Sequence, residues 1–92
     1  MKELKDTIEL MNSEDYKERF RAEYYQTKIR YEKLKKLNNK IEAYNHLDYD
    51  KRNIMEEPKY DCPVGMLMDQ QHVMGCYLHI LEVRAEIEKI EL

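Results

Sequence analysis

The fold of this chain is decided by residues 20–41, which read FRAEYYQTKIRYEKLKKLNNKI. One set of positions in this stretch recurs with alternating steps of four and three residues, and its members are Phe20, Tyr24, Thr27, Tyr31, Leu34, Asn38 and Ile41. This spacing places all seven side chains along one face of a single long helix. Basic residues flank that face. The sequence therefore predicts a basic, tyrosine-rich helix with one buried face.

The composition of the chain restricts the class of fold. Its 92 residues suffice for one small domain, and 38% of them are charged. Only two glycines and two prolines are present, whereas a β-sandwich or barrel needs many turns. We therefore predict an all-α fold in which residues 1–92 form a single helical domain.

Capping and turn residues divide this domain into helices. Ser13 is a favourable N-cap, and Pro63 suits the first position of a helix. Residues such as Asp48, Asp50 and Pro58 predict an irregular connector with room for one helical turn. The predicted elements are a short helix over 2–11, a long helix over 14–46, the connector over 47–62 and a last helix over 63–90.

The last helix repeats the spacing of the long one. Its seam consists of Leu67, Gln71, Met74, Leu78, Leu81, Ala85 and Glu88. If the two long helices form an antiparallel hairpin whose facing residue numbers sum to about 109, Asn38 meets Gln71 as a buried amide pair. A second apolar stripe lies beside this seam and comprises Met66, Val73, Tyr77, Ile80 and Ile87. One partner helix cannot cover both stripes, so the second stripe must meet the N-terminal helix or another subunit. Because a thin hairpin of this size buries little surface, we expect a helical homo-oligomer.

Charge is distributed unevenly along the chain. Residues 14–40 carry nine basic and five acidic side chains, a balance of +4, whereas residues 61–92 carry two and six, a balance of −4. The net charge of −3 argues against binding to duplex nucleic acid, although a local basic patch could hold a small anion. No apolar run approaches the roughly 20 residues of a membrane span, and the charged N-terminus does not resemble a signal peptide. We expect a soluble, cytosolic protein without a membrane partner.

Catalytic and metal-binding patterns are weak. His72, Cys76 and His79 share one helical face and could offer zinc nitrogen and sulfur ligands, but their spacing is not that of a structural zinc site. No oxyanion-hole element accompanies Cys76, and the scarcity of glycine removes phosphate-cradling loops. We predict no enzymatic activity, no cofactor and no metal.

The best candidate for a functional surface is the basic flank of the long helix. Tyrosine rings beside guanidinium and ammonium groups suit a ligand with a planar base and a phosphate, because the ring stacks and the cation pairs with the anion. The predicted ligand contacts are Arg19, Tyr24, Tyr25, Lys28, Arg30, Tyr31 and Arg84. The alternative is that these rings only pack and that the basic groups pair with Glu82, Glu86 and Glu88.

Two groups of motifs carry a resemblance to a known family. They are DYKERF at residues 15–20 with EY, QTK and RY up to residue 31, and CP, QQ, MG, YL and LEVRAEIE between residues 62 and 88. In these motifs the chain resembles a family of small uncharacterised proteins of tailed phages and prophages, named after a crAss-like phage protein. His72, Cys76 and His79 are not part of this pattern.

The resemblance implies a small accessory protein acting in the cytoplasm of an infected bacterium. By analogy, such a protein counters host defence as an oligomeric sponge that sequesters a cyclic nucleotide signal. An alternative is an inhibitor or adaptor, similar to anti-CRISPR proteins, that docks on a host defence protein through its acidic or methionine-rich surface. A structural phage component is a further alternative.

Overall fold

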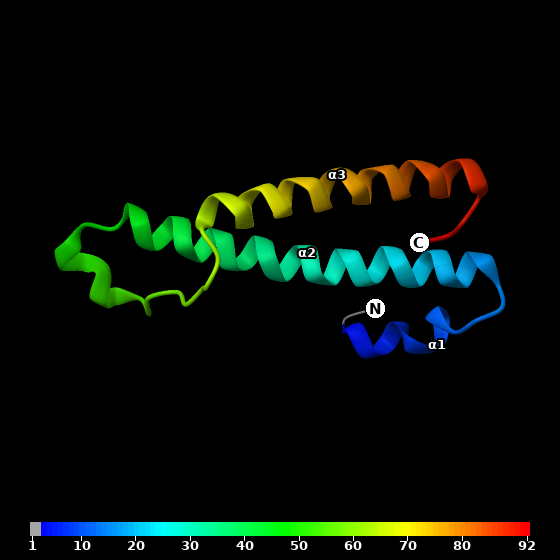
Figure 1. The fold of residues 1–92 in the computed structure, drawn as a ribbon, viewed down its shortest axis with the longest axis horizontal. Coiled ribbons are helices and arrows are strands. Elements are labelled where there is room, and N and C mark those ends of the chain that lie inside the picture. The colour runs from blue at the N-terminus through cyan, green and yellow to red at the C-terminus, as the bar shows by residue number, and fades with distance from the viewer. Residues whose placement is uncertain (1–2) are drawn as a thin grey trace.

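The computed structural model describes residues 3–92 and is elongated, with extents of 55 × 24 × 20 Å (Figure 1). In chain order the helical elements are η1 (Leu4–Thr7), α1 (Ile8–Met11), α2 (Tyr16–His46), η2 (Tyr49–Ile54) and α3 (Val64–Glu88), where η denotes a 3-10 helix. Helices account for 78% of the described residues 3–92 and no strand occurs among them, which confirms the all-α prediction.

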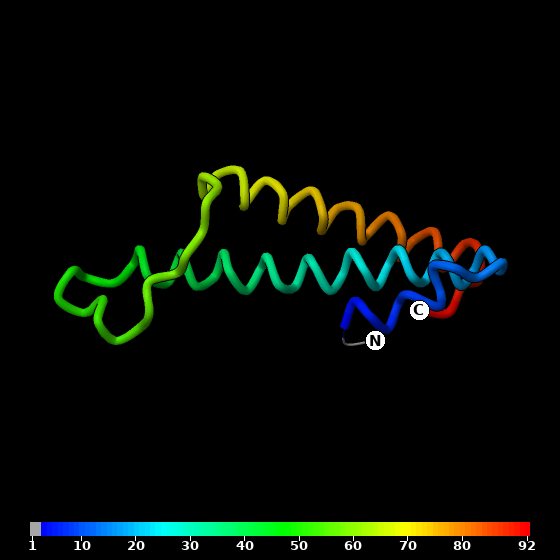
Figure 2. Tube along the Cα trace, turned by 60° about the horizontal axis from the view of Figure 1, so that its bottom comes forward, coloured from blue at the N-terminus to red at the C-terminus, as the bar shows by residue number. Residues whose placement is uncertain are grey.

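Helix α2 is the central element, with α3 on one side and α1 on the other (Figures 1 and 2). It begins two residues later than predicted, because Asp15 and not Ser13 is the N-cap: the Asp15 carboxylate accepts the Lys17 backbone N–H at 2.9 Å. Ser13 acts one step earlier, where its hydroxyl accepts the Asp15 N–H. The predicted end at residue 46 is correct.

Helices α2 and α3 lie side by side and run in opposite directions (Figure 1). The predicted contact between Asn38 and Gln71 is confirmed: the Asn38 amide donates to Gln71 Oε1 at 2.8 Å and to the Leu67 carbonyl at 3.1 Å. Asn38 Oδ1 is buried without a hydrogen-bond partner among residues 3–92. The amide pair therefore sets the register at some cost in stability, because one polar atom is left unsatisfied.

The core is concentrated at the end of the molecule that contains the start of α2. It consists of Phe20, Tyr24, Leu78, Leu81, Ala85 and Ile90, with Tyr25 and Tyr31 packed against them. Helix α3 ends at Glu88, two residues before the predicted end at about residue 90, because Lys89 adopts a left-handed conformation with φ 56°. The Ile90 N–H then bonds to the Ala85 carbonyl at 2.9 Å, and this turn returns the Ile90 side chain to the core.

The N-terminal segment is less regular than the predicted helix over 2–11, whose residue 2 lies outside the described part of the chain. It is a 3-10 turn followed by a single α-helical turn, and Leu4, Ile8 and Met11 are all exposed. Thr7 is buried instead: it donates to the Leu4 carbonyl at 2.7 Å and accepts from the Gln26 amide at 3.1 Å. The segment is thus held to α2 by a polar contact.

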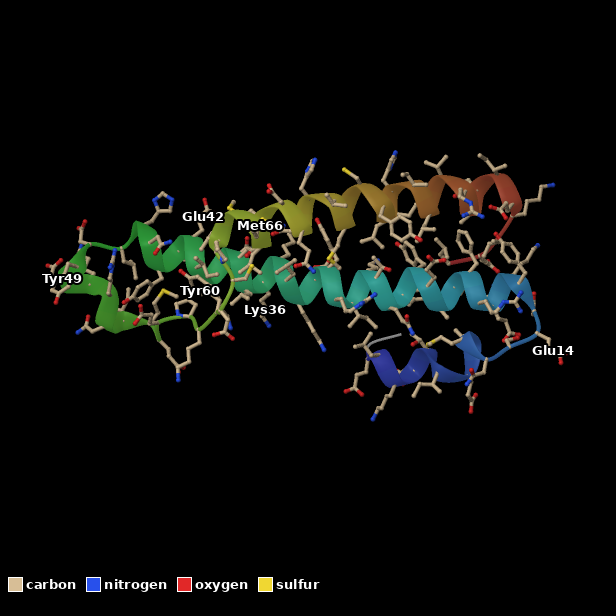
Figure 3. All side chains as sticks on the ribbon, viewed as in Figure 1. Glu14, Lys36, Glu42, Tyr49, Tyr60 and Met66 are labelled. Atoms are coloured by element: carbon tan, nitrogen blue, oxygen red, sulfur yellow. The ribbon has the colours of Figure 1, made fainter. Side chains whose placement is uncertain are left out.

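The connector forms one short 3-10 helix, η2, between irregular stretches. Its apolar residues Tyr49 and Ile54 are both exposed, and Figure 3 places Tyr49 at the far tip of the molecule. Arg52 holds the segment, because its guanidinium lies 5.0 Å from the Tyr44 ring and donates to the Leu47 carbonyl.

Candidate ligand-binding site

Three of the predicted contact residues form one cluster on α2, which we call the tyrosine–lysine cluster: Tyr24, Tyr25 and Lys28. The two rings meet edge to face, with centroids 5.2 Å apart and planes at 81°. The Lys28 ammonium lies 5.7 Å from the Tyr24 ring centroid, while the side chain itself remains exposed. The cluster thus combines a partly accessible aromatic surface on Tyr25 with an available positive charge.

Tyr24 is fixed within this cluster by a bond to α3. Its hydroxyl donates to Glu82 Oε2 at 2.6 Å. Burial, and secondly this bond to an anion, raise the pKa of Tyr24 well above its usual range. Tyr24 is therefore a neutral donor with a structural role, and Tyr25 is the member left to contact a ligand.

We expect Tyr24→Phe to lower the free energy of unfolding by about 1–2 kcal/mol at pH 8, because a bond to a charged acceptor is lost. The raised pKa of Tyr24 makes this difference depend on pH. Neutral Tyr24 contributes its full stabilisation while the pH is below about 10, the pKa of tyrosine in the unfolded chain. This contribution decreases as the pH rises from that value towards the higher pKa of Tyr24 in the folded protein. Urea unfolding at pH 8 and pH 10.5 should therefore show a smaller difference at the higher pH. An equal difference at both values would contradict this, and Tyr49→Phe, on an exposed ring, is the control.

Tyr31 lies one heptad further along α2 and lines a separate groove of about 660 Å³, here called the Tyr31 groove. Its other lining residues come from α3 and are Met68, Gln71, His72, Gly75, Cys76, His79 and Ile80. A Cβ atom at Gly75 would lie only 3.2 Å from the Tyr31 ring, so the glycine permits the ring to lie close to α3. The groove offers a ring, an amide and two imidazoles within the size range of ligand pockets.

A second groove, the Tyr24 groove of about 710 Å³, lies beside the C-terminal tail. It is lined by Tyr24, Glu82, Ala85, Glu86, Lys89, Ile90, Glu91 and Leu92. Three glutamates surround a single lysine there, so the lining repels anions. The Tyr31 groove has no acidic lining residue and is the better match for an anionic ligand.

The predicted arginines do not join the tyrosine–lysine cluster. Arg19 donates to the Ser13 carbonyl at 2.8 Å, and Arg30 donates to the Gln26 carbonyl at 3.4 Å. Arg84 forms a salt bridge with Glu88 at 2.9 Å and lies 5.1 Å from the Phe20 ring. The prediction grouped seven residues, but a single copy of the chain divides them among the cluster, the Tyr31 groove and three backbone or ion-pair contacts.

Arg84 belongs to a hydrogen-bond network between the ends of α2 and α3. Its Nη2 donates to the Tyr16 hydroxyl at 2.6 Å, and that hydroxyl donates to Glu88 Oε1 at 2.9 Å. The bond from Tyr16 and then the contact with Arg84 lower the pKa of Glu88. Arg84 thus connects α2 and α3. For this one residue, the contacts favour pairing with a glutamate over contact with a ligand.

Nine lysines and arginines lie between residues 17 and 40 of α2. None of the nine forms a salt bridge among residues 3–92; they are Lys17, Arg19, Arg21, Lys28, Arg30, Lys33, Lys35, Lys36 and Lys40. Figure 3 shows Lys36 projecting from α2 on the side away from α3. The expected pairing of these groups with Glu82 and Glu86 therefore does not occur, and their charge is available to an anion.

The histidines and cysteines of α3 lie near the Tyr31 groove. Cys76 Sγ is 3.7 Å from His72 Nε2, and both side chains are exposed. Within residues 3–92 no group of three or more His, Cys, Asp or Glu side chains could hold a metal ion.

A search of the helices within residues 3–92 found none with the length and apolar character that a membrane span requires.

Sequence reasoning did not assign the α3 wall of the Tyr31 groove to a ligand site. Gln71 was placed in the seam, and Gly75 was not considered. A glycine inside a helical pattern is an available signal for close approach of another element. What the pattern does not reveal is which ring approaches it, because that depends on the pairing of two distant helices.

Comparison with known proteins gives one match. No curated protein and no solved structure matches the chain. The sequence model of the Sequestin family matches residues 14–59, which include the motifs of residues 15–31 and all of α2, whereas the motifs from residue 62 onward lie outside the match. Since this match covers 46 of the 92 residues, the chain belongs to the Sequestin family.

Proposed function

We propose that this protein binds and sequesters a small anionic nucleotide, without catalysis, as a homo-oligomeric sponge. In this proposal it is a phage accessory protein that removes a cyclic nucleotide immune signal from the cytoplasm of an infected bacterium. The observation that carries the proposal is the basic flank of α2, whose lysines and arginines form no salt bridges within residues 3–92 and include Lys28, which lies over the Tyr24 ring. The family name also fits a protein that sequesters something.

The helical geometry supports one site for both parts of such a ligand. Lys28 precedes Tyr31 by three residues and Lys35 follows it by four, so both lysines project from the same side of α2 as the ring. A planar base can stack in the Tyr31 groove or on Tyr25, while a phosphate pairs with these ammonium groups. The amide of Gln71 and the imidazoles of His72 and His79 supply hydrogen bonds to base edges.

Sequestration requires tight binding without turnover. The site offers donors and rings but no nucleophile with an oriented base and oxyanion donors, so it favours retention of the ligand. A phage origin is implied by the resemblance of the motifs in residues 15–31 and 62–88 to phage proteins, and an anti-defence role is an analogy from size, origin and architecture. Both belong to this proposal.

Thermal-shift and calorimetric titrations with cyclic dinucleotides, cyclic trinucleotides and cyclic ADP-ribose isomers test the proposal. A ligand at 100-fold its Kd should stabilise the protein by about 2.7 kcal/mol. Lys28→Glu should weaken binding at least tenfold, because one charge-assisted contact is worth about 1.5–3 kcal/mol. The matched control is Lys59→Glu, on an exposed lysine of the connector.

Two results would count against the proposal. If no nucleotide in the panel shifts the melting temperature, sequestration of a nucleotide is wrong and a host protein becomes the target to test. If a nucleotide binds but Lys28→Glu and Lys59→Glu behave alike, the ligand site does not involve the tyrosine–lysine cluster.

A further inference from the structure

One side of α3 carries apolar side chains that no other part of residues 3–92 covers. Met66, Val73, Ile80 and Ile87 follow one another at intervals of seven residues and are 60%, 64%, 53% and 74% exposed. Cys76 and Val83 fall between them at the complementary heptad position and are also exposed. We call these six residues the heptad stripe. Contiguous exposed apolar surface of this kind marks an interaction site.

The seven-residue period indicates that the missing partner is a helix. A strict heptad keeps its apolar residues in line with one partner helix along its whole length. Helix α2 occupies the opposite side of α3, and α1 lies beyond α2 (Figures 1 and 2). Neither can reach the heptad stripe in the same chain.

We propose that the heptad stripe is the interface with a second copy of this chain, in which the two α3 helices pair antiparallel about a two-fold axis near Leu78. The inference rests on the homo-oligomeric part of the proposed function and is independent of which ligand is bound. A two-fold axis closes the assembly, because the same surface is used on both copies.

Charge favours the antiparallel orientation. The first part of α3, residues 64–79, has a single charged side chain, Asp69, whereas the four glutamates of this region all lie in residues 80–92. Parallel pairing would set the glutamates of both copies side by side, whereas antiparallel pairing places them beside the nearly uncharged half of the partner helix. The helix dipoles also favour antiparallel pairing, because they then point in opposite directions.

The register follows from the residues that flank the heptad stripe. An axis near residue 78 sets Val73 opposite Val83 of the second copy and Cys76 opposite its Ile80. On the flank, His72 then lies beside Glu86 of the second copy. Asp69 lies opposite Ile87 of the second copy, in the last turn of α3 at the end of the interface, where solvent reaches it. An axis near residue 74–75 would instead place Asp69 against Ile80 of the second copy, at the cost of desolvating a carboxylate.

The size of the surface is sufficient for a specific dimer. From Met66 to Ile87 the helix spans about 32 Å, and helices in contact lie about 8–10 Å apart. Two such surfaces together remove on the order of 1,000 Å² from water, near the lower limit of specific interfaces. We therefore expect association at micromolar concentration.

This pairing has a consequence for the Tyr31 groove. Cys76 and Ile80 belong both to the heptad stripe and to the lining of that groove. His79, another lining residue, lies next to the two-fold axis, so the grooves of the two copies become neighbours on one side of the dimer. A bound ligand can then contact both copies.

Sedimentation velocity without ligand, over about 1–100 μM, tests the interface. Wild type should reach twice the chain mass of 11.3 kDa. Ile80→Asp should weaken the dimer at least 30-fold while circular dichroism keeps the helical spectrum, since Ile80 is exposed. Ile54→Asp is the matched control, because Ile54 is also exposed but lies in η2, and it should dimerise as wild type does.

Disulfide trapping tests the orientation independently of stability. In a background with Cys62→Ser and Cys76→Ser, Val73→Cys and Val83→Cys chains are mixed under mild oxidation. Antiparallel pairing predicts mainly the mixed 73–83 disulfide, whereas parallel pairing predicts 73–73 and 83–83 disulfides.

A wild-type monomer at every concentration, or an Ile80→Asp variant that dimerises normally, would overturn the proposed interface. Predominant 73–73 and 83–83 disulfides would overturn its orientation. Because these measurements contain no nucleotide, they can fail while ligand binding succeeds, and the titrations of the proposed function can fail while the dimer persists.

Discussion

Leu81→Ala should lower the free energy of unfolding by about 2–5 kcal/mol, one of the two largest effects that we expect in this protein. Leu81 is only 1% exposed and packs among Phe20, Leu78 and Ala85 in the core. Removing three carbon atoms there loses their transfer free energy and leaves a cavity between two rigid helices. For a domain with about 5–14 kcal/mol of total stability, this is a large fraction.

Urea unfolding monitored by circular dichroism measures this effect, and a thermal scan should show a fall in Tm of roughly 10–20 °C. The control is Ile54→Ala, which removes a similar aliphatic side chain that is 73% exposed and should change stability by less than about 0.5 kcal/mol. Similar losses for both variants would mean that the packing of α3 on α2 does not dominate stability.

Phe20→Ala should destabilise the protein by about 3–5 kcal/mol. Phe20 is buried, its ring meets Tyr16 edge to face at 6.2 Å, and the Arg84 guanidinium lies 5.1 Å from its centroid. Truncation therefore removes a large apolar group and also the face on which Arg84 rests. The network of Tyr16, Arg84 and Glu88 should loosen with it.

A second substitution separates these two contributions. Phe20→Leu retains most of the apolar volume but removes the ring, so we expect it to cost about 1–2 kcal/mol less than Phe20→Ala. Equal losses for both variants would show that the ring's contacts with Tyr16 and Arg84 dominate. A loss below about 1 kcal/mol for Phe20→Ala would contradict the placement of Phe20 in the core.

The long helices were predictable because their signals are local and repeated. Alternating steps of three and four residues identify the buried faces of α2 and α3 over many turns. Even the pairing of Asn38 with Gln71 could be predicted, because each is the amide residue within its seam and burial of either amide requires a partner. Patterns of this kind are properties of the chain before it folds.

Helix ends and the N-terminal segment were less predictable, because competing local contacts decide them. Ser13 and Asp15 are both good N-caps, and only the folded linker shows that Asp15 caps α2. Lys89 occupies a left-handed position that usually favours glycine, since burial of Ile90 compensates for that conformation. Leu4 and Ile8 stay exposed because α2 offers Gln26, a polar partner, to Thr7.

The sequence indicates which residues of the candidate site are neighbours within one helix, but not which residues of different helices meet. Tyr24, Tyr25 and Lys28 lie together because helical spacing alone brings them close. Arg84 lies apart from them in a single chain, since it is on α3 and binds Tyr16 and Glu88. Contacts between helices depend on their rotation about the axis, which periodicity specifies only coarsely.

The sequence by itself determined that this protein is all-α, that α2 is basic and rich in tyrosine, and that residues 20–41 supply one buried face. Only the tertiary structure decided that Tyr31 lies against Gly75, that Tyr24 is held by Glu82, and that the cations of α2 are left without salt bridges among residues 3–92. The physical reason is the range of the interactions. Helical periodicity is encoded within a few neighbouring residues, whereas a groove or an ion pair depends on the angle and register at which two distant helices meet.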